Sequence, residues 1–362
     1  MHGPMKAALL TAPNKMEVVR VPFPECEPGG IVVRVQACAI CGSDVRTYLQ
    51  GGETNVPREW LAGAGLESGR LMGHEFSGVI ESVGERCTEF ARGERVAVSP
   101  SLPCGRCHSC LAGRENICED FRGLGQHLPG AYAEFVAVPE AALRAGNVHR
   151  LPDSLSPDEG ALIDPLASVL NGQEKADIRP GESVLVIGAG PIGCMHAALA
   201  RLSGAVPVIL AQRSAPRLEL ARRLECADAY IDTGREDLCS AVLGLTGGRG
   251  CDVVIVACPS RQAQEQSLAL VGRGGRIVMF GGLPRSDALI TVNGNDIHYR
   301  EITIHGAFAI RPSHFATSLK LIASGRVPAR KYVTNAFPLD GIGEAFSAEV
   351  LKRSLKVVIH PS

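Results

Sequence analysis

From residue 183 onward the sequence repeats one pattern, in which a short apolar run is followed by a turn and a helical segment. The apolar runs are SVLVI, VPVILA, DVVIVA and GRIVMF, and segments such as PIGCMHAALARL and APRLELARRL lie between them. Apolar runs that alternate with helices predict buried parallel strands, in a sheet covered by helices on both faces. We therefore expect a doubly wound α/β domain over residues 166–305.

The first turn of this pattern contains the segment GAGPIG. Gly188, Gly190 and Gly193 come directly after the run SVLVI, and an apolar helical segment starts at Pro191 and Ile192. Glycines in this context supply a tight turn, a close approach to a pyrophosphate and a helix N-terminus that attracts it. Although the glycine spacing alone would be a weak signal, its place between a strand and a helix predicts a dinucleotide-binding Rossmann domain.

The residues after the second strand bear on which dinucleotide is bound. NAD-binding domains usually carry an acidic residue there, which holds the ribose 2′-hydroxyl. Here Gln212 takes that position, and Arg213, Ser214 and Arg217 follow it. Because guanidinium groups bind phosphate well, we expect NADP(H) to be favoured over NAD(H). The alternative is that the arginines only solvate the start of a helix and leave the cofactor preference relaxed.

A second constraint is the stretch PCGRCHSCLAGRENIC, which contains four cysteines. They are Cys104, Cys107, Cys110 and Cys118. Four thiolates bind a structural zinc ion tetrahedrally, and closely spaced cysteines on a glycine-containing loop can converge on one ion without a large core. The stretch predicts a structural zinc site; a disulfide pair or four unrelated thiols are the alternatives.

The first half of the chain has a different texture. Up to about residue 160, short β-rich runs such as IVVRVQACAI and FSGVIESVG are broken by Gly and Pro, and a closing strand LKVVIH stands near the C-terminus. The 362 residues exceed what one hydrophobic core usually serves. We therefore expect a β-rich domain of residues 1–165 and 306–362 beside the dinucleotide-binding domain.

The β-rich half also contains candidates for a second zinc site. Cys41 stands in CGSD, and His74 with Glu75 stands in GHEFSG. A thiolate, an imidazole and a carboxylate suit zinc, and their separation in sequence means that they would converge from different loops. Taken singly, the three have ordinary interpretations as a buried thiol, a core histidine and a surface glutamate.

The order of these motifs resembles the zinc-containing medium-chain dehydrogenases, and most of all their sorbitol (polyol) and threonine dehydrogenase branch. The resemblance spans nearly the whole chain and implies a GroES-like catalytic domain beside the Rossmann domain. It implies that Cys41, His74 and Glu75 ligate a catalytic zinc, that Ser43 is the proton-relay hydroxyl, and that Asp164 ligates zinc or holds its water. With the four-cysteine site, it implies two zinc ions per chain.

The resemblance also implies an activity. It is hydride transfer between NADP(H), or NAD(H), and the carbinol or carbonyl carbon of a polyol, sugar or amino alcohol. One alternative is an NADPH-dependent reductase of activated aldehydes or ketones. Another is a non-catalytic nucleotide-binding protein on a dehydrogenase scaffold, against which the intact Cys41, His74 and Glu75 set argues.

The sequence departs from the family pattern in three places. Arg46 stands where polyol dehydrogenases commonly carry a histidine, so their final proton relay cannot simply be transferred. Only Arg311 remains of an Arg-Tyr pair that contacts substrate in sorbitol dehydrogenases. The segment between Tyr48 and His74 looks long for the family and contains Trp60, the single tryptophan; we expect it to cover the substrate cleft or to face solvent.

Composition limits the partners. The formal net charge is −1, with no basic stripe or basic amphipathic helix, so we expect a small-molecule substrate and neither nucleic acid nor membrane. The 13 scattered cysteines suit a reducing compartment, the cytoplasm. The strand-like segment EITIHGAF is a candidate sheet edge for a homodimer or homotetramer, unless its own chain covers it.

Overall fold

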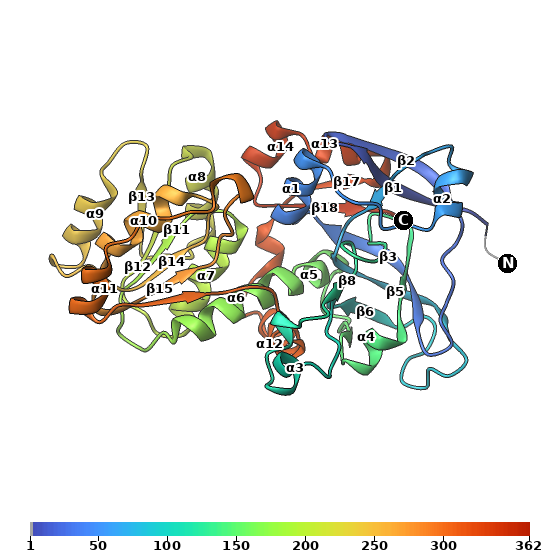
Figure 1. The fold of residues 1–362 in the computed structure, drawn as a ribbon, viewed down its shortest axis with the longest axis horizontal. Coiled ribbons are helices and arrows are strands. Elements are labelled where there is room, and N and C mark those ends of the chain that lie inside the picture. Colours follow the sequence, from blue (N-terminus) through green and yellow to red (C-terminus); the bar gives the residue numbers. More distant parts are fainter. Residues whose placement is uncertain (1–2) are drawn as a thin grey trace. The chain divides into compact units, whose positions relative to one another are not determined.

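The computed structural model describes residues 3–362, apart from the side chains of Arg285, Ala348 and Glu349. It divides into two compact units (Figure 1). Unit 1 comprises the chain up to Ala167 together with Ala309–Ser362, and unit 2 is Ser168–Phe308. The expected fold class, a β-rich domain with a doubly wound parallel-sheet domain, is confirmed.

Unit 1 is built mainly from short strands. Its strands are β1 Met5–Ala12, β2 Lys15–Val21, β3 Ile31–Ala39, β4 Arg70–Leu71, β5 Glu75–Val83, β6 Arg95–Val98, β7 Ser101–Leu102, β8 Arg122–Gly123, β9 Phe135–Val138, β10 Val148–Arg150, β17 Val333–Pro338 and β18 Lys356–His360. Its helices are α1 Gly42–Gln50, α2 Arg58–Gly63, α3 His108–Leu111, α4 Glu140–Arg144, α5 Pro157–Ala161, α12 Pro312–Ala323, α13 Ile342–Ala345 and α14 Ala348–Arg353, and α6 Ile163–Ala176 begins in this unit.

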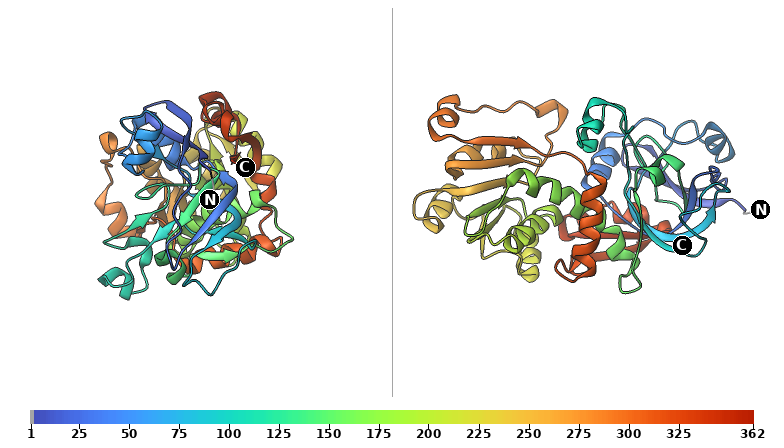
Figure 2. Two further views of the ribbon diagram at one scale, coloured as in Figure 1. Left: turned by 90° about the vertical axis from the view of Figure 1, so that its right-hand side faces the viewer. Right: turned by 90° about the horizontal axis from the view of Figure 1, so that it is seen from below.

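The largest sheet of unit 1 joins distant parts of the sequence. Its order is β10-β6-β5-β3-β18-β17, and β9 also pairs with β3. Strand β3 therefore lies between β5 and β18, so that Ala39 pairs with Glu75 on one side and with Val358 on the other. In Figures 1 and 2 the N-terminal segments and the red C-terminal segment share this unit. This strand order brings residues near positions 41, 75 and 356 together at one end of these neighbouring strands.

The long segment that contains Trp60 is partly exposed, but it also contributes to the core of unit 1. It includes helix α2, and Trp60 and Leu61 are only 7% and 5% exposed. Both side chains belong to the core cluster of unit 1, which also includes Leu9 and Leu71. The Trp60 side chain therefore stabilises unit 1 itself, because burying a large aromatic side chain is favourable, whereas residues such as Glu59 and Glu67 of the same segment are exposed.

Unit 2 alternates strands and helices as the sequence predicts. Its elements are β11 Val184–Ile187, α7 Pro191–Leu202, β12 Val208–Gln212, α8 Ala215–Leu224, β13 Ala229–Asp232, α9 Leu238–Leu245, β14 Cys251–Val256, α10 Arg261–Leu270, β15 Val271–Met279, α11 Gly294–Arg300 and β16 Thr303–Gly306. The strand order is β13-β12-β11-β14-β15-β16, and each neighbouring pair is parallel.

Helices cover both faces of this sheet. Leu185 and Ile187 join a core cluster with Val242 of α9 and Leu268 of α10. Val184 and Val186, which point to the opposite face because side chains alternate along a strand, are fully buried as well. The continuous apolar run of β11 therefore indicates a strand whose two faces are both buried.

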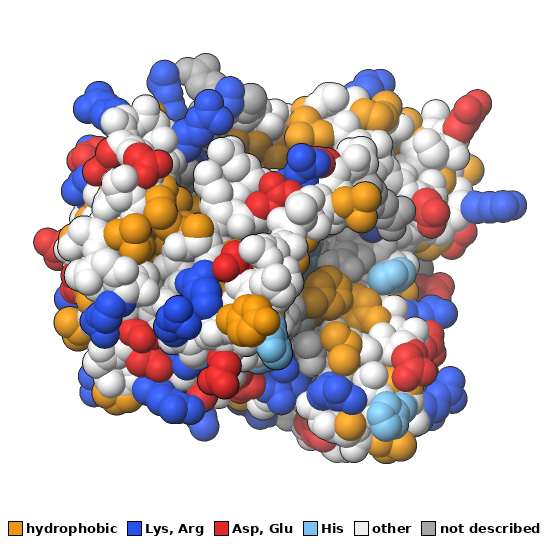
Figure 3. All heavy atoms as spheres, turned by 60° about the vertical axis from the view of Figure 1, so that its left-hand side comes forward, with side chains coloured by type: hydrophobic (Ala, Val, Ile, Leu, Met, Phe, Trp, Pro, Cys, Tyr) orange, Lys and Arg blue, Asp and Glu red, His pale blue; other side chains and the backbone are white. Residues whose placement is uncertain are grey.

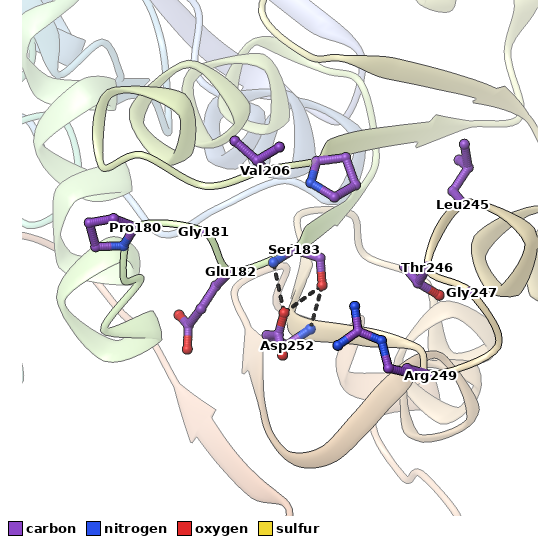
Figure 4. Close-up of a pocket in the computed structure, with 11 residues that line it drawn as sticks. Pro180, Gly181, Glu182, Ser183, Val206, Leu245, Thr246, Gly247, Arg249 and Asp252 are labelled. Atoms are coloured by element: carbon purple, nitrogen blue, oxygen red, sulfur yellow. Dashed lines mark hydrogen bonds between the residues drawn. The ribbon is translucent and has the colours of Figure 1, made fainter.

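The amino ends of β11, β12 and β14 border a polar pocket of about 560 Å³ (Figure 4). There the Asp252 carboxylate accepts hydrogen bonds from the backbone N–H and the hydroxyl of Ser183, at 2.8 and 2.6 Å. These bonds tie β14 to β11 at the end of the sheet that lies away from Gly188. The pocket contains none of the residues predicted to bind the cofactor.

Candidate active site

The three candidate ligands of the catalytic zinc converge in unit 1. Cys41 lies between β3 and α1, and His74 and Glu75 stand at the start of β5, the neighbour of β3. The ligand atoms of the three residues lie within 4.8 Å of one another. His74 and Glu75 are 5% and 1% exposed, so the site is buried rather than a chance surface cluster.

Asp44 contacts His74 and is itself held by Tyr132. The Nδ1 of His74 lies 3.3 Å from Oδ1 of Asp44, a contact that is not aligned as a hydrogen bond, and Asp44 Oδ2 accepts a hydrogen bond from the Tyr132 hydroxyl at 2.8 Å. Burial alone would lower the pKa of His74, but the charges of Asp44 and Cys41 outweigh it and raise the pKa well above its ordinary value. A site that draws positive charge this strongly suits a metal cation, with Asp44 at Nδ1 and Nε2 left as ligand.

Glu75 is paired with a lysine that the sequence did not single out. The ammonium of Lys356 on β18 forms an ion pair with Glu75 Oε2, and it also donates a hydrogen bond to the carbonyl of Ile40 at 3.2 Å. Both charged side chains are almost fully buried, at 3% and 1% exposed. Burial disfavours the charge on Lys356, but Glu75 and Cys41 outweigh it and raise the pKa of the lysine.

Asp164 lies near these groups but is not one of the three that converge within 4.8 Å. It is 6% exposed, and its Oδ1 has no hydrogen-bond partner among the described residues. Burial raises the pKa of Asp164 to about 7, with His74, Glu75 and Lys356 close enough to act on it. A buried carboxylate oxygen without a partner calls for a cation, a water or a substrate hydroxyl.

The donor set therefore fits zinc. A thiol, an imidazole and a carboxylate are the ligand types that zinc takes in catalytic sites, where three protein ligands leave one position open. The buried pairing of His74 with Asp44 supplies the outer carboxylate that usually orients a zinc-bound histidine.

The other residues singled out near this site have clear places in unit 1. Ser43 is partly buried in the first turn of α1, next to Cys41, whereas Arg46 is exposed on the same helix. Arg311 precedes α12; its guanidinium contacts His314 and donates a hydrogen bond to the carbonyl of Gly113 at 3.4 Å. Arg311 thus links α12 to the loop that contains the four cysteines.

The four cysteines of the PCGRCHSC stretch also converge. Their sulfur atoms lie within 4.8 Å of one another, and all 13 cysteines of the chain are free thiols. Backbone N–H groups point at the sulfurs, as between Cys110 N and Cys107 Sγ at 3.4 Å and between Cys104 N and Cys118 Sγ at 3.2 Å. Backbone N–H groups of Glu119 and Cys110 lower the pKa of Cys107 to about 6. Burial raises the pKa of Cys110 to about 12 and also raises the pKa of Cys118. The fit to a tetrahedral zinc ion therefore rests on the convergence of the four sulfur atoms.

The glycine turn of unit 2 has the geometry that a pyrophosphate needs. Gly188 has φ +111°, and a Cβ on Gly193 would lie 1.7 Å from the Gly188 carbonyl oxygen, so both positions require glycine. A Cβ on Gly190, in contrast, would meet no atom within 4 Å. Helix α7 starts here without a side-chain cap, which leaves its first N–H groups for a ligand.

The predicted cofactor residues are only partly brought together. A pocket of about 750 Å³ lies at the carboxyl ends of the strands, and its lining includes Ile187, Gly188, Gln212 and Arg213. The Gln212 side chain folds back, and its Oε1 accepts hydrogen bonds from the N–H groups of Arg213 at 2.8 Å and Ser214 at 3.4 Å. Arg217 does not line this pocket; it is partly buried in α8, near Cys194.

Several residues of these sites escaped the sequence analysis. Asp44 stood inside the CGSD motif, where only its neighbours were interpreted. Lys356 gave a signal that could have been used, since it is a lone charge in the apolar strand LKVVIH. Thr233 and Cys258, which line the 750 Å³ pocket, follow β13 and β14, and the carboxyl ends of parallel strands are where such pockets form.

The surface of the chain is mixed in charge. On the face that Figure 3 shows, Lys and Arg side chains (blue) are interspersed with Asp and Glu side chains (red). Over residues 3–362, no helix is long and apolar enough to cross a membrane.

Comparisons with known proteins identify the family of the chain. The family model of the alcohol dehydrogenase GroES-like domain matches residues 27–153, and that of zinc-binding dehydrogenases matches residues 191–324. A sorbitol dehydrogenase of Bacillus subtilis is 30% identical over 99% of this chain and 98% of its own. An L-threonine 3-dehydrogenase of Rhizobium johnstonii is 31% identical over 99% of both chains.

A solved structure of a zinc-binding dehydrogenase from Sinorhizobium meliloti, bound to NADP, superposes with a TM-score of 0.89 at 32% identity. It covers 99% of this chain and 100% of its own. These matches extend over both units, as the motifs do. The chain therefore belongs to the zinc-dependent medium-chain dehydrogenases and is an enzyme of their sorbitol and threonine dehydrogenase-like branch.

Proposed function

We propose that this enzyme oxidises a polyol, sugar or amino alcohol at a zinc site formed by Cys41, His74 and Glu75, with hydride transfer to a nicotinamide cofactor. The observation that carries the proposal is the convergence of these three ligand atoms within 4.8 Å in a buried site. The resemblance over nearly the whole chain to a sorbitol dehydrogenase and to threonine dehydrogenases supports a substrate with several polar groups.

In this proposal the residues of the site have different roles. A bound zinc ion supplies a Lewis acid for the substrate oxygen, and a bound nicotinamide supplies the hydride acceptor. Ser43 Oγ, close to Cys41 in sequence, would relay the hydroxyl proton of the substrate: it accepts that proton while it donates its own to the cofactor ribose or to water. Asp164, with its buried Oδ1 free, holds a second polar group at the site, either a water or a substrate hydroxyl. Asp44 keeps the His74 ring in place.

We further propose that the enzyme contains two zinc ions per chain, the second in the four-cysteine lobe. Metal analysis of the purified protein tests both sites at once. Two zinc ions in the wild type and one in Cys41→Ala are expected. One zinc ion in both proteins would overturn the proposed catalytic site, because only the lobe would then hold metal.

NADP(H) is the cofactor that we propose. The end of β12 offers Gln212 in place of an acid, and Arg213 is exposed where it lines the 750 Å³ pocket. Gln212 in place of a carboxylate removes one repulsion that a 2′-phosphate would meet at the end of β12, and the Arg213 guanidinium can pair with the phosphate. Glu236 and Asp237 also line this pocket, so the arginine carries the proposal. The NADP-bound structure of the similar Sinorhizobium meliloti protein supports this choice.

Paired titration of NADPH and NADH tests the choice. We expect NADPH to bind more tightly, and Arg213→Ala to weaken NADPH by about tenfold while leaving NADH within twofold, since one exposed charge pair with phosphate is lost. The exposed Arg223, on the same helix α8 as Arg217, provides a matched control as Arg223→Ala. Equal or tighter binding of NADH would overturn the NADP proposal without touching the zinc site.

We also propose that the chain forms a homodimer through β16. This strand is the last in its sheet, and Ile304 is 37% exposed there, with Tyr299 and Phe308 nearby in sequence at 71% and 65%. An exposed strand edge with apolar side chains readily pairs with a second copy. Light scattering of the wild type and of Ile304→Lys tests this: a dimer that dissociates in the variant is expected, and a monomeric wild type contradicts it.

A further inference from the structure

The charged side chain of Lys356 is buried, which costs free energy of desolvation. Its side chain is 3% exposed within a strand whose other residues are mostly Val and Ile, and its ammonium meets Glu75 and the Ile40 carbonyl. Taking an ammonium and a carboxylate out of water costs more than their pairing usually returns, and an apolar pair of equal volume is often as stable. The stability of unit 1 therefore does not explain this pair.

The charge of Lys356 acts on the catalytic site rather than on the surrounding core. The groups that favour its charged form are Glu75, Cys41 and Asp164, all of them predicted to serve the zinc. Glu75 presents two oxygens, of which Oε2 is held by the lysine and Oε1 is not. Oε1 is therefore the oxygen of Glu75 that has no contact with the lysine.

We propose that Lys356 is a positioning residue of the catalytic metal site: it holds one oxygen of Glu75, so that Glu75 binds zinc through the other oxygen and one position on the metal stays open for substrate. This inference rests on the proposed function, since it assumes a metal at Cys41, His74 and Glu75. Without the lysine, the carboxylate is free to bind through both oxygens and to close the open position.

Lys356→Met removes the ammonium while keeping an apolar stem of similar length, and the exposed Lys352 provides the matched control as Lys352→Met. Cobalt(II) in place of zinc reports coordination, because its visible absorption weakens as the coordination number rises above four. The spectrum of cobalt-loaded Cys41→Ala, in which only the four-cysteine lobe holds metal, is subtracted to isolate the catalytic site.

We expect Lys356→Met to show a weaker visible band than the wild type and to bind zinc on the order of tenfold more tightly in chelator competition, since a nearby positive charge is gone and a carboxylate oxygen is added. We expect kcat to fall about tenfold or more. In a Glu75→Gln background, Lys356→Met should leave the cobalt spectrum unchanged, because no second carboxylate oxygen exists to bind.

An unchanged cobalt spectrum and a zinc affinity within twofold of the wild type would overturn the inference. If Lys356→Met does not fold, Lys356→Leu carries the same test, because it also removes the donor to Glu75 Oε2; a weaker visible band and tighter zinc binding are then the expected results. A wild type that lacks the second metal ion would instead overturn the proposed function, so the two failures are distinguishable.

Discussion

The two candidate zinc sites of unit 1 share a metal but are built in opposite ways. The four-cysteine lobe draws all its ligands from fifteen consecutive residues, and backbone N–H groups of that same stretch point at the sulfurs. The candidate catalytic site combines Cys41, His74 and Glu75 with Asp164 and Lys356, which come from distant segments. Pairing of β3 with β5 and β18 brings most of them together, and Asp164 comes from helix α6. A local site needs only its own loop, whereas a long-range site needs the folded unit first.

The largest expected effect is the loss of turnover in Cys41→Ala without a loss of stability. Cys41→Ala removes one ligand of the catalytic zinc, so turnover should fall by more than about 10³-fold. The melting temperature should stay within a few degrees of the wild type, since Cys41 contributes little to the core. Steady-state kinetics and thermal unfolding check the two parts, and a zinc-depleted, folded Cys41→Ala protein with normal activity would contradict the assignment.

Cys107→Ala should produce the reverse pattern. The lobe loses its tetrahedral ligand set, so we expect the melting temperature to fall by about 10 °C or more. Activity per folded, catalytic-zinc-loaded molecule should change by less than about threefold, because no lobe cysteine touches the substrate. Calorimetry with zinc analysis tests this; equal stability with and without lobe zinc would show that the lobe is not a clamp.

Ser43→Ala tests a smaller step at the catalytic site. Loss of the hydroxyl beside Cys41 should lower kcat by ~10²-fold, the usual contribution of one general acid-base group. Zinc content and cofactor affinity should not change, since Ser43 is predicted to ligate neither. The measurement is the pH profile of kcat. A variant with the wild-type profile would show that Ser43 does not transfer the proton and that other residues do so.

The smallest expected effect concerns the links that hold the long-range site. His360 at the end of β18 pairs with Asp158 of α5 at 2.7 Å, which ties the strand of Lys356 to the helix just before Asp164. The hydrogen bond with Asp158 raises the pKa of His360 above its ordinary 6.5. The stabilisation is therefore complete below that value and is lost as pH rises through the folded pKa.

Unfolding by denaturant at pH 6 and pH 8.5 measures this link. We expect the wild type to lose slightly more stability than Asp158→Asn over that range, by a few tenths of a kcal/mol, because the pair is partly exposed. An equal pH dependence in the two proteins would show that the pair does not contribute.

Much of the fold could be predicted from the sequence, because the patterns that indicate strands, helices and turns are local. The alternating apolar runs predicted the parallel sheet of unit 2, and GAGPIG predicted a turn in which Gly193 has no room for a Cβ. The Trp60 segment shows what local signals do not give. Its length suggested a loop, but α2 packs into the core, and only tertiary contacts decide whether an aromatic side chain is buried.

The cofactor contacts show the same limit on a smaller scale. The position of Gln212 at the end of β12 followed from counting along the pattern, and the structure places it there. Whether the next arginines reach the pocket depends on where α8 begins: Arg213 precedes the helix and lines the pocket, whereas Arg217 lies within the helix near Cys194. Two arginines four residues apart would lie on one face of a continuous helix, but here the helix begins between them.

The sequence by itself determined the ligand types, the glycine turn, the four-cysteine lobe and the fold class, because each depends on neighbours within a few residues. The tertiary structure alone decided that Glu75 meets Lys356, that Asp44 meets His74, and that Asp164 keeps an oxygen without a partner. These contacts join segments that lie dozens to hundreds of residues apart, and in a buried site of low dielectric constant such long-range neighbours fix the charge of each group.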